Sequence, residues 1–181
     1  IINSHLICAK LISKFGSDEQ KLKWLPSMAT GELRGCFSLS EPDSGSDAGA
    51  LRCRAERDGD EWVINGTKMW VTNGEKAGVV ALLARVPDGE EENSGGITCF
   101  IVEKTPGSEG GEGVSISRKI DKLGYRGLET VEMSYVDHRL NHDQLLGGDN
   151  GIGNGLRWAL SALELGRINV AARGVGVAQT A

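Results

Sequence analysis

Apolar residues recur at helical spacing near the start of the chain, and this pattern predicts two short helices. The first carries its apolar stripe as far as Phe15 and ends at Gly16. Ser17, followed by Gln20 three residues later, has the pattern of a capping box and opens the second helix. Pro26 is expected to end that helix, because proline lacks the backbone N–H that a helix interior needs.

Short apolar runs that are typical of β-strands dominate the middle of the chain, and no long helical pattern interrupts them. Such a series predicts an antiparallel β-barrel or orthogonal sandwich. Asn65-Gly66 is the dipeptide most typical of a two-residue hairpin loop, so we expect a hairpin there. The expected strands are Cys36–Leu39, Leu51–Arg57, Glu61–Ile64, Thr67–Thr72, Val79–Val86, Thr98–Glu103, Val114–Lys119 and Val131–Val136.

The pattern becomes helical again after Gly153. Leu156, Leu160 and Leu163 fall on one face of a long predicted helix. Gly166 interrupts this helix at a cost of roughly 1 kcal/mol relative to alanine. A glycine at this cost indicates either close packing or a ligand that passes over the backbone.

These elements divide the chain into three parts, and the fold class is therefore α+β. Residues 1–34 form the end of a helical domain, residues 35–145 a middle β-domain, and residues 146–181 the start of a second helical domain. The chain begins at Ile1 without an initiator methionine and stops at Ala181 inside a helical pattern. We therefore expect it to be a fragment of a longer protein.

Composition narrows the class of partner. The 181 residues include 25 acidic and 20 basic side chains, with a net charge of −5, which argues against binding to nucleic acid or to anionic membranes. No apolar run approaches the roughly 20 residues of a membrane span. The four cysteines lie far apart without a Cys-x-x-Cys pair. We therefore expect them to act as small buried apolar residues, and the protein to lie in a reducing, intracellular compartment.

Two other motifs in the sequence suggest different chemistry and are set aside. Gly151 to Gly155 contains a Gly-x-Gly-x-Gly spacing, but no βαβ unit surrounds it, so we interpret it as a flexible entry into the helix. The segment Asp137–Asp143 carries two histidines between carboxylates, but an arginine lies at its centre. We expect a solvated loop there and no metal site.

The candidate chemistry lies in a polar turn and in the strand arm after Gly66. Trp70 and Thr72 are separated by roughly 7 Å on one face of that arm, since side chains alternate along a strand. An indole plane beside a hydroxyl suits a flat, polar cofactor, and the turn from Pro42 to Gly49 can offer backbone amides to its phosphates. Taken alone, the arm fits better an ordinary half-buried strand with a core tryptophan, because tryptophan usually serves packing.

The order of these motifs resembles the acyl-CoA dehydrogenase family along nearly the whole chain. Residues 37–47 read Phe-Ser-Leu-Ser-Glu-Pro-Asp-Ser-Gly-Ser-Asp, and residues 65–74 read Asn-Gly-Thr-Lys-Met-Trp-Val-Thr-Asn-Gly. Phe-Gly-x-x-x-Gln-Lys at residues 15–21 and Lys-Leu-Gly-Tyr-Arg-Gly at residues 122–127 match further family segments. Asp43-Ser44 departs from the Gly-Ala often found after Glu-Pro and adds a negative charge.

The resemblance implies an FAD enzyme that converts an acyl-CoA thioester to the trans-2-enoyl-CoA. A glutamate takes the α-proton, and flavin N5 accepts the β-hydride. It also implies a role in fatty acid or amino acid catabolism, a homotetramer, and an acceptor such as an electron-transfer flavoprotein. The implied location is the cytoplasm in a bacterium or the mitochondrial matrix in a eukaryote.

Residue roles follow by the same resemblance. Ser46 would serve the diphosphate and touch CoA, and Glu164 and Arg167 would contact the CoA moiety. Gly166 stands where some branches carry the catalytic glutamate, so the base is expected beyond Ala181, with Glu164 as the weaker alternative. The residues expected to bind FAD are Phe37, Leu39, Ser40, Ser46, Trp70, Val71 and Thr72.

The sequence is also compatible with other functions and with another role for Arg167. A related flavin oxidase, of the acyl-CoA oxidase or nitroalkane type, would share the scaffold and differ in its access to oxygen. A non-catalytic β-domain could use the same groove for a peptide or nucleotide ligand. Arg167 could simply form a surface ion pair with Glu164, three residues earlier on the helix.

Overall fold

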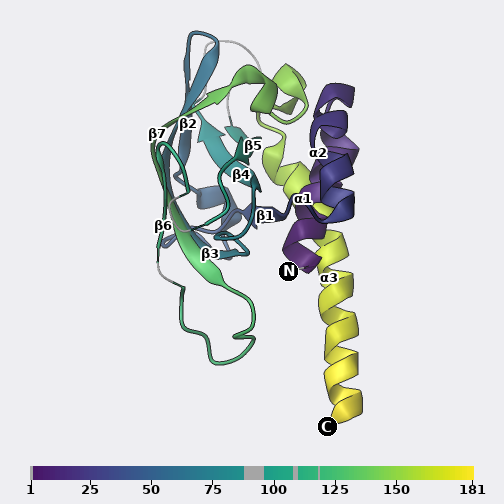
Figure 1. Cartoon of the computed structure of the whole chain (residues 1–181). Coiled ribbons are helices and arrows are strands. Elements are labelled where there is room, and N and C mark those ends of the chain that lie inside the picture. Colours follow the sequence, from purple (N-terminus) through teal and green to yellow (C-terminus); the bar gives the residue numbers. More distant parts are fainter. Residues whose placement is uncertain (1, 88–95, 108–109, 118) are drawn as a thin grey trace.

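A curled β-sheet lies beside a layer of helices in the computed structural model, which describes residues 2–87, 96–107, 110–117 and 119–181 (Figure 1). This arrangement confirms the expected α+β class. The helices are α1 (Ile2–Phe15), α2 (Asp18–Thr30) and α3 (Gly155–Thr180). The strands are β1 (Gly35–Ser38), β2 (Arg54–Asp58), β3 (Glu61–Thr72), β4 (Val79–Val86), β5 (Gly96–Glu103), β6 (Val114–Ile116) and β7 (Thr130–Asn141).

The sheet is mixed, where the sequence pattern predicted antiparallel pairing throughout. Its strand order is β1-β4-β2-β3-β7-β6, with β5 also paired to β4. β1 runs parallel to β4, and β2 joins β4 through one parallel bridge between Arg54 and Arg85. Parallel pairing requires a long connection, and β1 is separated from β4 by β2 and β3.

The strand β4 is buried on both faces, which explains its unbroken apolar run. Its side chains alternate between two cores. Val80, Leu82 and Ala84 pack inside the curl of the sheet, together with Trp62 and Tyr135. The side chains between them face the helices and join the second core, which includes Ile7, Leu11, Trp24, Ala81 and Leu83.

All four cysteines are buried and free, as the sequence predicted. Burial raises the pKa of the Cys53 thiol to about 11 and that of Cys8 to about 12. These thiols therefore stay protonated at neutral pH and act as small apolar residues.

The capping box before α2 is confirmed, but the helix continues beyond Pro26. Ser17 Oγ accepts from the Gln20 backbone N–H at 3.2 Å, and the Ser17 N–H donates to Gln20 Oε1 at 3.0 Å. The helix then runs through Pro26 to Thr30 and ends at Gly31 in the left-handed conformation. Trp24 and Met28 are buried in the helical core, and their burial outweighs the backbone hydrogen bond that Pro26 removes.

The hairpin predicted at Asn65-Gly66 is wrong, because β3 passes straight through both residues. The turn lies instead at Asp58–Glu61, where β2 and β3 pair. Gly66 has φ +148°, and the pairing of β3 with β7 shifts register beside it. A Cβ on Gly66 would lie 2.7 Å from Cys53 Cα. Glycine is therefore required by its positive φ and by the close approach of Cys53, whereas the bulge lies in β7, where Val136 and Asp137 oppose Asn65.

The segment Asp137–Asp143 also differs from the loop that was expected. β7 continues to Asn141, and His138 pairs with Ile64 of β3. In the part of the chain that the structure describes, no three His, Cys, Asp or Glu side chains come together as a metal-binding group. Of the described helices, none is both long enough and apolar enough to cross a membrane.

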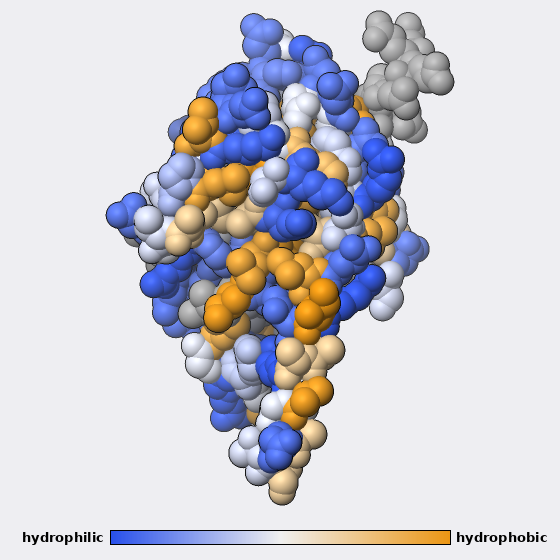
Figure 2. Space-filling model, turned by 90° about the vertical axis from the view of Figure 1, so that its right-hand side faces the viewer, coloured by the Kyte–Doolittle hydropathy of each residue, from blue (hydrophilic) through white to orange (hydrophobic). Residues whose placement is uncertain are grey.

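The end of α3 extends away from the rest of the molecule (Figure 1). Figure 2 shows apolar side chains gathered on the helical face and along the tapering end of the molecule. Three of the exposed apolar residues of α3 are Ile168, Val175 and Val177, which are 66%, 70% and 65% exposed. A contiguous apolar surface of this kind is typical of an interaction site.

We expect Gly66→Ala to lower the free energy of unfolding by about 1–3 kcal/mol, because the new Cβ would clash with Cys53 in an unfavourable backbone conformation. Chemical denaturation measures the change. Gly45→Ala is the matched control, since a Cβ there meets nothing within 4 Å. Equal unfolding midpoints for the two variants would contradict the close packing of Gly66 against Cys53.

Candidate functional site

A bulge in β3 determines how Trp70 is presented. Lys68 pairs with Met133 and Val71 with Val131, so two residues of β3 oppose one residue of β7. Trp70 lies inside this bulge with φ +63°, and its side chain is 54% exposed. Strict alternation therefore fails, because Lys68 and Val71 are both buried. A large aromatic held exposed in a strained conformation is a feature typical of ligand sites.

A buried ion pair ties this bulge to the polar turn. Lys68 is fully buried, and its Nζ donates to Glu41 Oε1 at 2.8 Å and to the Leu39 carbonyl at 3.0 Å. The Glu41 carboxylate also accepts from the backbone N–H groups of Arg52 and Cys53, at 2.7 and 2.9 Å. Both carboxylate oxygens of Glu41 thus have hydrogen-bond partners, and Lys68 Nζ has two acceptors.

A backbone hydrogen bond reinforces this link. The Met69 N–H donates to the Ser40 carbonyl at 2.8 Å. The Ser40–Glu41 segment is thereby fixed beside Trp70. Sequence reasoning gave no role to Lys68 or Glu41, although two charged residues next to buried strand positions could have suggested a pair.

The environment of Glu41 favours its charged form. Desolvation by burial acts to raise the pKa of this carboxyl group, but the hydrogen bonds from Lys68 and from the backbone of Arg52 and Cys53 outweigh it. The pKa of Glu41 therefore lies below its ordinary value of 4.5. The group is ionised at neutral pH.

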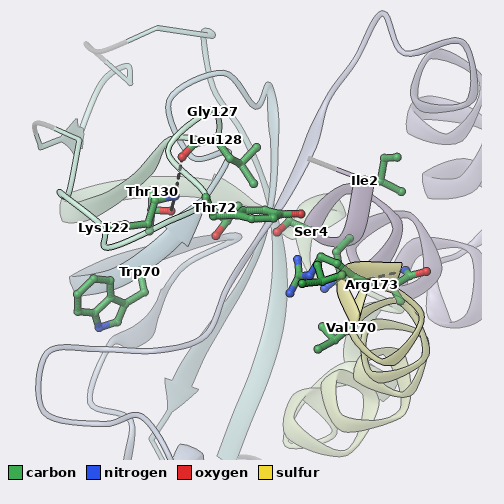
Figure 3. A pocket seen from close by; sticks show the side chains of 14 residues that line it. Ile2, Ser4, Trp70, Thr72, Lys122, Gly127, Leu128, Thr130, Val170 and Arg173 are labelled. Atoms are coloured by element: carbon green, nitrogen blue, oxygen red, sulfur yellow. Dashed lines mark hydrogen bonds between the residues drawn. The ribbon is translucent and has the colours of Figure 1, made fainter. Parts of the chain in front are cut away.

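Trp70 and Thr72 line an open cleft of about 1300 Å³. Figure 3 shows its two walls: Thr72 and the segment from Lys122 to Thr130 on the sheet side, and Ile2, Val170 and Arg173 on the helical side. The cleft thus lies between the end of β3 and the helices α1 and α3. A cavity of this size is large enough for a cofactor and part of a substrate.

The segment from Lys122 to Thr130 is held by Lys122. Its Nζ donates to the Leu128 carbonyl at 2.6 Å and to Thr130 Oγ1 at 3.0 Å. Tyr125, at the tip of this segment, has φ +61°. The Arg173 guanidinium lies 4.6 Å from the centre of the Tyr125 ring, so a cation–π contact joins the two walls.

The cleft is positively charged. Lys122 and Arg173 line it, and the lining residues that the structure describes include neither aspartate nor glutamate. The whole chain, in contrast, has a net charge of −5. This arrangement favours an anionic occupant.

The other residues expected to bind the cofactor do not line the cleft. Phe37 and Leu39 are partly buried against the helical core. Val71 is buried. Ser40 is half-buried, and Ser46 is exposed on the turn.

Glu164 and Arg167 lie on the exposed surface of α3 and do not line the cleft. They form no ion pair with each other in the described part of the chain. Gly166 is buried against α1, where a Cβ would lie 3.2 Å from Ile7 Cδ1. Of the two explanations for this glycine, the structure therefore supports close packing.

Comparison with known proteins identifies relatives over the whole chain. Residues 36–138 match the sequence profile described as "Acyl-CoA dehydrogenase, middle domain", and residues 1–32 match "Acyl-CoA dehydrogenase, N-terminal domain". A (2S)-methylsuccinyl-CoA dehydrogenase from Cereibacter sphaeroides is 40% identical, over 97% of this chain and 32% of the relative. The human mitochondrial short-chain specific acyl-CoA dehydrogenase is also 40% identical, over 99% of this chain and 41% of its own length.

A solved structure shows the same similarity. The glutaryl-CoA dehydrogenase of Mycobacterium smegmatis, in complex with FADH2, is 37% identical and has a TM-score of 0.75. The match covers 88% of this chain and 37% of that one. The chain therefore spans about a third to two fifths of the length of these relatives.

We expect Lys68→Met to lower the free energy of unfolding by about 3–5 kcal/mol, because it leaves the Glu41 carboxylate buried without its counter-charge. The double variant Lys68→Met, Glu41→Gln should be more stable than the single variant, since both charges are gone. Arg139→Met is the control: Arg139 also bonds two carboxylates, but at the exposed surface, so its loss should matter much less. A Lys68→Met effect as small as the control's would contradict the role of the pair.

The same pair predicts a dependence of stability on pH. Because the folded-state pKa of Glu41 is lowered, its stabilisation is fully present above 4.5 and is lost as the pH falls through the lowered value. Urea unfolding at a series of pH values should show this loss in the wild type. The double variant should not show this loss of stability at low pH. If the wild type and the double variant have identical pH profiles, the predicted contribution of Glu41 is disproved.

Proposed function

Because this chain belongs to the acyl-CoA dehydrogenase family, we propose that it is part of an enzyme that oxidises an acyl-CoA thioester with FAD as cofactor. FAD, when bound, supplies the electron-pair acceptor: the β carbon loses a hydride to flavin N5 and the α carbon loses a proton to a glutamate base, which leaves the trans-2-enoyl-CoA. The observation that carries this proposal is the half-exposed Trp70 beside Thr72 on the wall of a positively charged cleft.

The residues at this wall suit a flavin. The exposed indole of Trp70 gives an aromatic surface for a ring system, and the Thr72 hydroxyl can hydrogen-bond to the edge of that ring. The Ser40 hydroxyl and the main chain around Leu39 would face the pyrimidine edge. These groups are held beside Trp70 by the Lys68–Glu41 pair, so they need little rearrangement on binding.

The remaining expected residues have supporting roles in this proposal. Phe37 and the main chain of Val71 would complete the contact with FAD. Ser46, exposed on the turn, would serve the diphosphate and touch CoA. Glu164 and Arg167, exposed on α3, would contact the CoA moiety.

We propose that the catalytic base comes from outside residues 1–181. No carboxylate is found among the described residues of the cleft lining. Glu164 precedes Arg173 by nine residues, which places the two on opposite sides of an α-helix. Since Arg173 faces the cleft, Glu164 faces away from it, and this disfavours Glu164 as the base.

The division into domains and the partners follow from the family. We propose that residues 1–34, 35–145 and 146–181 belong to an N-terminal helical domain, a middle β-domain and a C-terminal helical domain. The exposed apolar side chains of α3 fit a protein that buries this helix in further domains and in a homotetramer. An electron-transfer flavoprotein would accept the electrons, in the mitochondrial matrix or the bacterial cytoplasm.

The names of the relatives do not select one acyl group. One relative is named for methylsuccinyl-CoA and another for short chains, at the same 40% identity. The choice of acyl group must therefore be sought in the cleft of this chain. Fatty acid or amino acid catabolism is the proposed setting.

We expect the full-length protein to be yellow from bound FAD and to bleach under anaerobic conditions when it receives its acyl-CoA. Thr72→Val should slow this reduction by about 2- to 10-fold, the value of one net hydrogen bond, with little effect on the fold. Stopped-flow absorbance measures the rate, and Thr30→Val, at an exposed helix end, is the control.

A colourless protein that cannot be reconstituted with FAD would rule out the proposed function. If the flavin of the Thr72→Val variant is reduced at the wild-type rate, only the proposed role of the Thr72 hydroxyl is ruled out. Hydrogen peroxide formed in step with the product under air would instead identify a flavin oxidase.

A further inference from the structure

Arg173 is an exposed cation on the helical wall of the cleft. The other lining residues of this wall are the apolar Ile2, Val170 and Val177 and the polar Asn3, Ser4 and Asn169 (Figure 3). Apolar side chains alone would suit a simple hydrocarbon tail. A guanidinium among them becomes desolvated when the cleft fills, and this is costly unless an anion accompanies it.

The hydrogen-bonding groups of Arg173 have no acidic partner in the described part of the chain. Its contact there is the cation–π contact with Tyr125 at 4.6 Å. The other cation of the cleft, Lys122, already donates to the Leu128 carbonyl and to Thr130. Arg173 therefore has donors available for a ligand, whereas Lys122 holds its own loop.

The contact with Tyr125 prepares Arg173 for a planar anion. The aromatic ring covers one face of the guanidinium, so the N–H groups at its edge are left to bind. Such an edge matches the two oxygens of a carboxylate in a bidentate arrangement. Because Tyr125 lies on the opposite wall, the cation is held across the cleft.

The position of Arg173 along α3 separates it from the stretch that we assign to CoA. It follows Arg167 by six residues, which is about 9 Å along the helix axis. With CoA at Arg167, as proposed above, a ligand group at Arg173 is offset from the CoA contact by about 9 Å. A carboxylate bound there fits the far end of the acyl group.

We propose that Arg173 is a specificity-determining residue that binds the terminal carboxylate of a dicarboxylic acyl-CoA. This inference rests on the proposed function and adds the substrate class to it. Tyr125 is the positioning residue that holds the guanidinium. The enzyme then prefers a thioester with a distal carboxylate to the monocarboxylic thioester of the same chain length.

The test uses the full-length enzyme with bound FAD and two pairs of substrates of equal carbon number: glutaryl-CoA with valeryl-CoA, and adipyl-CoA with hexanoyl-CoA. We expect a higher kcat/KM for the dicarboxylic member of at least one pair. Arg173→Gln should lower that value by about 10- to 100-fold, the range for a hydrogen bond to a charged group. It should raise the value for the monocarboxylic partner, because an unpaired cation no longer faces a methyl group.

Two further variants sharpen the result. Arg173→Lys keeps the charge but loses the planar fork, so it should restore part of the preference. Arg157→Gln removes a cation from the same helix at an exposed position outside the cleft and should leave the preference unchanged. The FAD content and melting temperature of each variant are measured beside the kinetics.

Each contrary outcome has a distinct meaning. A wild type that prefers both monocarboxylic thioesters, or an Arg173→Gln variant with an unchanged ratio, overturns the proposal while FAD reduction still supports the proposed function. If Arg173→Gln loses FAD while the melting temperature of the FAD-free protein is unchanged, Arg173 binds a phosphate of the cofactor and the proposal is overturned. If no acyl-CoA reduces the flavin of the wild type, the proposed function fails, and this inference fails with it.

Discussion

The buried ion pair between Lys68 and Glu41 is the interaction on which the candidate site depends. It joins a turn that follows β1 to a bulge in β3, and the backbone N–H groups of Arg52 and Cys53 complete the shell around the carboxylate. A buried pair of this kind contributes little net stability by its presence, but its geometry is strict because a misplaced charge is costly. The pair therefore fixes where the turn lies relative to the indole of Trp70.

Two bulges, one in β7 and one in β3, shape one wall of a site. Opposite the first, Gly66 of β3 lets the chain near Cys53 approach closely, and the second exposes Trp70 while Lys68 and Val71 stay buried. A regular strand would place alternate side chains on opposite faces and could not bury these two together. Irregular backbone thus lies where the cleft begins, and regular pairing continues on both sides of it.

The second wall comes from α1 and α3, which pack on the face of the sheet that β4 and β5 present. Gly166 permits that close packing of α3 against α1. The cleft between the walls carries positive charge on an acidic chain. Family membership is the basis for the proposed flavin and CoA thioester, whereas the Arg173–Tyr125 contact is a feature of the cleft lining itself.

Local features of this protein were readable from its sequence, and long-range ones were not. The capping box at Ser17 and Gln20, the apolar stripe of α1, the positions of most strands and the ordered motifs all depend on residues a few places apart. The role of Asn65-Gly66, the parallel pairing of β1 with β4, the burial of Lys68 against Glu41 and the meeting of Arg173 with Tyr125 depend on segments distant in the chain. Periodicity and turn propensity describe a residue's neighbours in sequence, but the approach of one backbone to another is decided only when the whole core packs.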